Sequence, residues 1–245
     1  MKKSFAFLLM ILLISASLVS AQTASTNLMV HEDIVKPSMD VKYREALKKL
    51  KAACELHKLS FSWNTIGLYD NSYRHFAPLK SFADLDKNPF ADLEAKMGKE
   101  AFGKLMADFD ECLESHSDFV LAQLTELSYL SPPVGENYRD ITYWYALPGK
   151  EAEAESILGE WKKLYESKKA TNGYTVNKVI FGREAYYAIA SWGKNAVDAA
   201  TKAQKTQELL GEEGGKLWMR TQAISKKFYG KRAEVLPEFS YSMPK

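Results

Sequence analysis

The chain has 245 residues, of which 46% are apolar and 26% are charged, so it can bury a core as one large domain or two small ones. Its 13 glycines and 8 prolines are too few for a collagen-like or broadly disordered protein. Its 2 cysteines exclude a scaffold held together by many disulfides.

The first 21 residues have the pattern of a secretory signal peptide. Lys2 and Lys3 precede an apolar run at 5–14, and small residues ending at Ala21 fit cleavage before Gln22. The alternative is a retained membrane anchor, but the run is shorter than the roughly 20 residues of a bilayer span. Cleavage removes two of the 33 basic residues and none of the 31 acidic ones, which balances the formal charges. We therefore predict an exported protein, periplasmic or extracellular, with no integral membrane span after cleavage and no nucleic-acid partner.

The remainder of the chain repeats itself at a shift of 111 to 113 residues. Segment 126–132 recurs as 238–244 with the same glutamate, serine, tyrosine and proline, and the Gly-Lys-Leu of 103–105 recurs at 215–217. A nearly constant shift indicates an internal duplication. The predicted organisation is a signal peptide at 1–21, a short tail at 22–27, one repeat at 28–132, a linker at 133–138 and a second repeat at 139–245.

Both repeats have the same order of predicted elements. The first is expected to contain a strand at 28–35, a helix opened by Pro37, strands at 61–68 and 73–77, a helix interrupted near Gly98, and a strand at 119–127. The second is expected to contain a helix around 154–165, strands at 174–181 and 185–192, a helix interrupted at Gly211, and a strand at 233–241. This is the order of a ferredoxin-like unit, whose helices cover only one face of its sheet. We predict an α+β fold in which two ferredoxin-like (βαββαβ) repeats pack sheet to sheet as an intramolecular α+β barrel.

One short motif accompanies this order. The second repeat has Tyr145-Ala146-Leu147-Pro148-Gly149-Lys150-Glu151, which is a strand end, then Pro-Gly, then a helix opening with charged residues. The combination resembles the dimeric α+β barrel superfamily, which includes antibiotic-biosynthesis monooxygenases, EthD-like and NIPSNAP-like proteins and haem-handling relatives. The first repeat departs from the motif, because Lys36-Pro37-Ser38 has no glycine. The resemblance implies the fold; it transfers no catalytic residue, because cofactor-free monooxygenase relatives use aromatic, Asn or His groups at varying positions.

Alternation along the first strand separates its two faces. We expect the barrel interior to receive Met29, His31, Asp33 and Val35, and the helices to receive Leu28, Val30 and Ile34. A slip of one residue would instead place Glu32, Tyr143 and Tyr145 inside.

The candidate ligand-binding residues are His31, Asp33, Trp63, His75 and Trp144. A histidine titrates near neutrality and a neighbouring carboxylate raises its pKa, which suits a general base. The alternative is that the His31–Asp33 contact is structural or lies at an open rim. His57 and His116 are expected at helix ends, where they cap the helix dipole or face solvent.

No metal or nucleotide site is indicated, because the sequence lacks HxH, HExxH, CxxC, GxGxxG, P-loop and GxSxG patterns; the cofactor stays unknown. Cys54 and Cys112 fall on apolar stripes in the last turns of the two helices of the first repeat. If those helices run parallel, their ends are neighbours and export favours oxidation, so a Cys54–Cys112 disulfide and two buried free thiols both stay open.

Three functions remain open at this stage. The favoured one is a non-catalytic barrel that binds a small-molecule ligand. The others are a cofactor-free monooxygenase or haem-handling enzyme, and a structural or interaction protein with a filled barrel. We expect a monomer or a weak homo-oligomer.

Overall fold

The computed structural model describes residues 26–244, so the predicted signal peptide and its cleavage site lie outside the described residues. Within 26–244, no helix is long and apolar enough to cross a membrane. The first half contains β1 (Asn27–Val35), α1 (Asp40–His57), β2 (Asn64–Leu68), β3 (Ser72–Leu79), α2 (Ala91–Met97), α3 (Lys99–Asp110) and β4 (Leu113–Gln123). The second half contains β5 (Tyr138–Ala146), α4 (Glu151–Ser167), β6 (Thr175–Phe181), β7 (Tyr187–Gly193), α5 (Ala196–Ala223) and β8 (Ser225–Val235).

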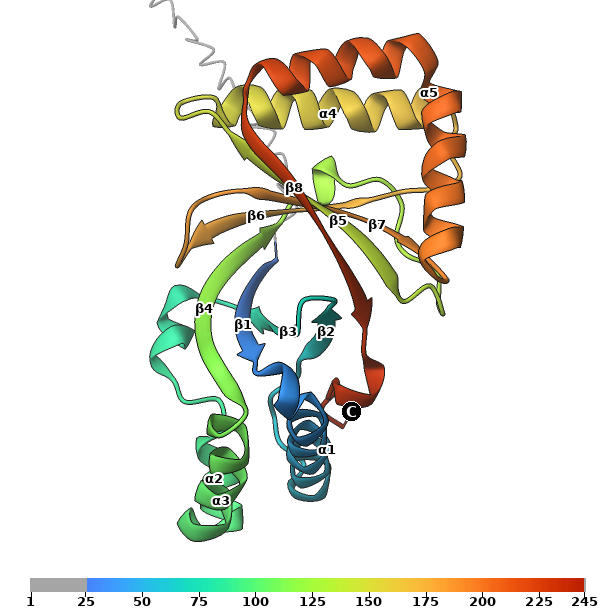
Figure 1. Ribbon diagram of the computed structural model, residues 1–245. Helices are drawn as coiled ribbons and strands as arrows, with labels where there is room; N and C mark the ends of the chain where they lie inside the picture. Colours follow the sequence, from blue (N-terminus) through green and yellow to red (C-terminus); the bar gives the residue numbers. More distant parts are fainter. Residues whose placement is uncertain (1–25, 245) are drawn as a thin grey trace, which may run out of the picture.

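The eight strands form a closed barrel in the order β1-β3-β2-β8-β5-β7-β6-β4, and every neighbouring pair is antiparallel. The β2–β8 and β4–β6 pairs join the two halves. Helices α1 to α3 cover the outer face of one half, and α4 and α5 cover the other at the opposite end of the molecule (Figure 1). Each half therefore covers the bare sheet face of the other, which confirms the predicted fold class.

The barrel interior is packed with side chains from both halves. Its buried cluster contains Val30, Leu68, Phe119, Leu121, Ile141, Tyr143, Tyr145, Val179, Tyr186, Ala188 and Ala233. Arg74 also lies inside and donates to Glu32 and to the hydroxyl of Tyr143. An ion pair at this depth is stable only because its donors and acceptors are satisfied by one another.

This interior corrects the assignment of strand faces. The barrel interior receives Glu32, Tyr143 and Tyr145, as the one-residue slip predicts, while Asp33 faces α1 and bonds to Tyr43 there. The expectation that Met29, His31, Asp33 and Val35 face the interior is wrong. Alternation shows that a strand has two faces, but here both faces are buried, so polarity does not reveal which one points inward.

The last strand of each half begins earlier than predicted. The sequence pattern predicts strands at 119–127 and 233–241, but β4 begins at Leu113 and β8 at Ser225. Their first residues are mostly polar and exposed, so they lack the apolar alternation on which the prediction depends. After each strand the chain turns through a short 3-10 helix, at Thr125–Leu127 and at Pro237–Phe239.

Residues 125–129 and 237–241, which we call the crossing segments, each pass onto the opposite half. Tyr129 pairs with Tyr174 of the second half, and Tyr241 pairs with Trp63 of the first. These segments contain the repeated Glu-x-Ser-Tyr sequence, so one motif performs the same task twice.

The serines of the crossing segments have equivalent bonds. The Ser128 hydroxyl accepts the backbone N–H of Val176 at 2.9 Å, and the Ser240 hydroxyl accepts that of Thr65 at 2.9 Å. Each serine also donates to the backbone carbonyl four residues earlier. Each half is thus completed by residues that follow the last strand of the other.

The two cysteines are free and buried, so the predicted Cys54–Cys112 disulfide is wrong. Helices α1 and α3 are antiparallel, because β4 starts beside the end of β1 and α3 therefore arrives where α1 begins. Ion pairs from Lys42 to Glu111 and from Lys49 to Asp108 mark this arrangement. Cys112 thus lies near the start of α1, and Cys54 lies in its last turn, where burial raises the pKa of the thiol to about 12.

Candidate functional site

A cavity of about 530 Å³ lies in the first half, between the outer face of the sheet and the helices. We call it the first cavity. Strands β1, β3 and β4 form its floor, and α1, α3 and the segment 85–90 form its walls. Its apolar walls include Leu50, Phe61, Trp63, Phe90, Met106 and Phe109.

The floor is polar and centres on His31. Its Nδ1 donates to Asp118 at 2.8 Å, and its Nε2 lies 3.0 Å from Oδ1 of Asp33. The second contact is an ion pair without hydrogen-bond geometry, so among the described residues Oδ1 of Asp33 has no hydrogen-bond donor. The Asp33 side chain is only 6% exposed, and a buried carboxylate oxygen in this condition is a strong acceptor for a ligand.

The two carboxylates fix the charge of His31. Burial alone would lower the pKa of His31, but the hydrogen bond to Asp118 and the charge of Asp33 outweigh burial and raise it from 6.5 to about 10. Burial alone would raise the pKa of Asp33, but the contacts with His31, His75 and Tyr43 hold it well below its usual range. At neutral pH the floor therefore contains an imidazolium between two carboxylates.

A second set of bonds holds Asp33 from the helix side. The Tyr43 hydroxyl on α1 donates to Oδ2 of Asp33 at 2.6 Å and lies 3.0 Å from Nε2 of His75. Nδ1 of His75 lies 3.0 Å from the Thr65 hydroxyl, which donates to the carbonyl of Phe239 in the crossing segment. The floor is thus supported by α1 and by the far end of the chain.

The structure brings four of the five predicted ligand-binding residues together. The first cavity is lined by His31, Asp33, Trp63 and His75. They lie under the helices, outside the barrel, and not in the barrel interior that the sequence analysis predicts. Trp144 lies in the other half, buried beneath α4 and α5.

Sequence reasoning missed three residues of this site. Tyr43 carries the helical apolar pattern of a core residue, which conceals its hydroxyl contact. Asp118 and His116 precede the predicted start of the last strand, yet both lie on β4 and line the cavity. The expectation that His116 ends a helix is therefore wrong, whereas His57 is the last residue of α1.

Two of the three histidines that line the first cavity, His31 and His75, have no ring nitrogen free to bind a haem iron. A haem iron needs a ligand atom with a free lone pair. Both ring nitrogens of His31 face carboxylates, and both ring nitrogens of His75 face hydroxyl groups. Among the described residues, no group of three or more His, Cys, Asp or Glu side chains has a metal-binding arrangement.

A closed barrel of two ferredoxin-like halves, with a cavity between sheet and helices, is the dimeric α+β barrel fold built from one chain. Solved structures with this fold include an anthrone oxidase-like protein, with a TM-score of 0.57 and 15% identity over 86% of this chain and 92% of that one. A proposed monooxygenase from Lactobacillus acidophilus NCFM has a TM-score of 0.55 and 8% identity over 89% and 97%. A mutant chlorite dismutase from Candidatus Nitrospira defluvii has a TM-score of 0.54 and 9% identity over 88% and 93%.

These similarities establish the fold and not the activity, because the sequences differ so much. No protein-family model matches the sequence, and no curated protein matches it.

Proposed function

We propose that this protein binds a flat, largely aromatic small molecule in the first cavity, through a hydroxyl group that donates to Asp33. The observation that carries this proposal is the Oδ1 atom of Asp33, an ionised and buried acceptor to which no group in residues 26–244 donates, in a cavity with aromatic walls. The signal-peptide pattern at 1–21 further supports export to the cell envelope or beyond.

The charge of the floor defines the class of ligand. Asp33 and Asp118 are both ionised, and within the described part of the chain His31 is the one protonated side chain that contacts both of them. The floor is therefore net negative, and an anionic ligand would lose its hydration without compensation. An uncharged hydroxyl donor suits it better, and its ring can lie against Phe61, Trp63 or Phe90.

The same charges favour binding over acid–base catalysis. A general base works best when its pKa is near the working pH. The pKa of Asp33 is held far below neutrality, and His31 is already protonated at pH 7. Neither group is a good proton acceptor, so the pair suits a recognition site.

Calorimetric titration with 2-naphthol tests the proposal, with 2-methoxynaphthalene as a ligand of similar shape that has no hydroxyl donor. We expect Asp33→Asn to weaken 2-naphthol binding at this site about tenfold, which is the effect of one hydrogen bond to a charged group. The methoxy compound should bind the wild type and the variant alike. Asp118→Asn is the matched control. It removes the same charge from a carboxylate that is 62% exposed, so it should weaken 2-naphthol binding less than Asp33→Asn does. Equal 2-naphthol affinity in the wild type and Asp33→Asn would contradict the proposal.

Cofactor-free oxidation is a second candidate, supported by one feature of the floor. A phenol whose hydroxyl donates to Asp33 lies beside the His31 imidazolium, which offsets part of the negative charge that develops on the phenol oxygen during oxidation, and an anthrone oxidase-like protein shares the fold. Oxygen uptake with 2-naphthol, measured in the same samples, distinguishes the two functions. Binding without uptake supports recognition alone, and uptake lost in His31→Gln supports oxidation.

A further inference from the structure

A second cavity, of about 640 Å³, lies in the other half, beneath α4 and α5. It occupies the place that corresponds to the first cavity, but its floor is different. Thr142 stands where the duplication would place His31, and Trp144 where it would place Asp33. The charged network of the first cavity therefore has no counterpart here.

The backbone of α5 holds this cavity open. Gly211 has φ 52° and ψ −138°, which breaks the helix into the two arms seen in Figure 1. Gly98, with φ 83°, separates α2 from α3 at the equivalent point of the first half. After the bend, Gly215 lines the cavity, and a Cβ atom there would meet no atom within 4 Å. The bend and the missing side chain leave room that no neighbouring group fills.

The walls present aromatic faces. Trp161 and Trp218 line the cavity and are partly exposed, with Phe228 between Trp218 and the buried Trp144. The indole N–H of Trp161 donates to the Thr221 hydroxyl at 3.1 Å. This ring therefore offers its face, not its N–H, to an occupant, and such a surface suits a flat ring.

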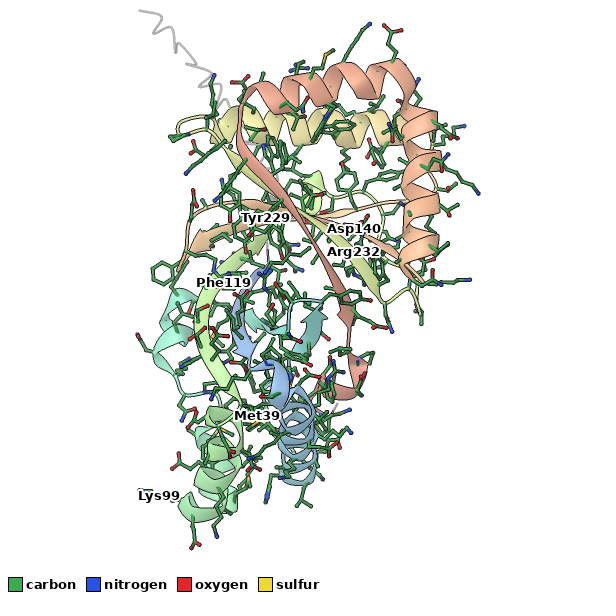
Figure 2. The ribbon with its side chains drawn as sticks, in the orientation of Figure 1. Met39, Lys99, Phe119, Asp140, Tyr229 and Arg232 are labelled. Atoms are coloured by element: carbon green, nitrogen blue, oxygen red, sulfur yellow. The ribbon has the colours of Figure 1, made fainter. Side chains whose placement is uncertain are left out.

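The walls also lack positive charge. Among the described residues that line this cavity, Asp140 is the one charged side chain, and it is exposed at the rim. It lies opposite Arg232 on the neighbouring strand β8 (Figure 2). An anion would thus leave water for a site with nothing to neutralise it.

Two polar groups of this cavity have no hydrogen-bond partner among the described residues. They are the Tyr174 hydroxyl, on a residue only 6% exposed, and Oδ1 of Asn172. Burial raises the pKa of Tyr174, so its hydroxyl stays protonated and can donate. Leaving such groups unpaired is unfavourable, and the pair offers one donor and one acceptor two residues apart.

We propose that the second cavity binds an uncharged, flat ring compound that carries a hydroxyl donor beside an oxygen acceptor. The ligand hydroxyl donates to Oδ1 of Asn172, the Tyr174 hydroxyl donates to the neighbouring ligand oxygen, and the ring lies against the tryptophans. This site is separate from the first cavity and does not depend on the function proposed for it.

Titration of the full chain with 2,3-dihydroxynaphthalene tests this proposal, with naphthalene-2-sulfonate as an anionic ligand of the same ring size. Calorimetry gives the affinity, and tryptophan fluorescence reports the site, because three of the 5 tryptophans line this cavity. We expect Tyr174→Phe to weaken binding about tenfold and Gly215→Leu to abolish it. All titrations are made in the Asp33→Asn background, which weakens binding of a hydroxyl donor in the first cavity, so that the heat and the fluorescence change come from the second cavity.

Stability measurements separate a binding role from a structural one. Tyr174→Phe removes a hydroxyl that has no partner, so the empty variant should unfold at the same or a higher urea concentration than the wild type. If Gly215→Leu fails to fold, Tyr174→Phe still decides the question. Unchanged affinity in Tyr174→Phe, or sulfonate binding as tight as that of the diol, would overturn the proposal.

Discussion

Replacing Asp33 with asparagine changes one charge at the floor of the first cavity and leaves the side-chain shape nearly intact. The rise in the pKa of His31 from 6.5 to about 10 would be worth about 5 kcal/mol if fully counted, at about 1.4 kcal/mol per pKa unit. His31 is 35% exposed and keeps Asp118, so solvent screening reduces the share lost with Asp33 to about 2 kcal/mol. We expect Asp33→Asn to lower the free energy of unfolding by about that amount at pH 6.

The sign of this effect fixes its pH dependence. The pKa of His31 is higher in the folded chain than in the unfolded chain, so the pairing stabilises fully below pH 6.5 and is lost as pH rises toward 10. Urea unfolding of wild type and variant at pH 6, 8 and 10 should show a shrinking difference, and an NMR titration should show a lower pKa for His31 in the variant. Asp118→Asn, at the exposed carboxylate, should have the smaller effect on stability. A difference that stays constant from pH 6 to 10 would refute the reasoning.

Two further predictions concern the packing of the barrel and the crossing segments. Glu32→Gln removes the carboxylate that neutralises the buried Arg74, and urea unfolding should show a loss of about 3 kcal/mol; a loss below about 1 kcal/mol would show that Arg74 finds another partner. Tyr241→Phe removes a buried hydroxyl that donates to the Leu59 carbonyl at 2.9 Å, and should cost about 1–2 kcal/mol in the same assay. Tyr129→Phe is its matched counterpart in the other half and should cost a similar amount, so a neutral result for both would show that the crossing segments add little stability.

The duplication and the fold could be predicted from the sequence because they depend on spacing and on element order. The serine and tyrosine of the segment at 126–132 recur in the segment at 238–244, and in both segments they make equivalent contacts with the opposite half. Spacing along the chain is preserved when a gene segment is copied, so the duplication can be detected from a constant shift even where the two copies share few residues.

The orientation of the site could not be predicted, for a physical reason that Asp33 illustrates. Alternation along β1 separates Val30 from His31, but the barrel interior is as apolar as the layer under the helices, so neither face is marked as the inner one. Asp33 faces the helices because it bonds to Tyr43 on α1, and the sequence pattern of Tyr43 is that of an apolar core residue, which does not reveal this contact. Likewise, the sequence gives no direct sign that α1 and α3 are antiparallel, and the disulfide prediction for Cys54 failed on that point alone.

Joining both halves in one polypeptide has a consequence for how the two cavities can differ. In a symmetric pair of identical chains, any substitution appears in both cavities at once, so a residue that improves one must also be tolerated in the other. Here position 33 is aspartate while its counterpart 144 is tryptophan, a combination that no pair of identical subunits can hold. Because both halves are in one chain, the residues of each cavity can change independently, while both cavities are built on the same closed barrel of strands.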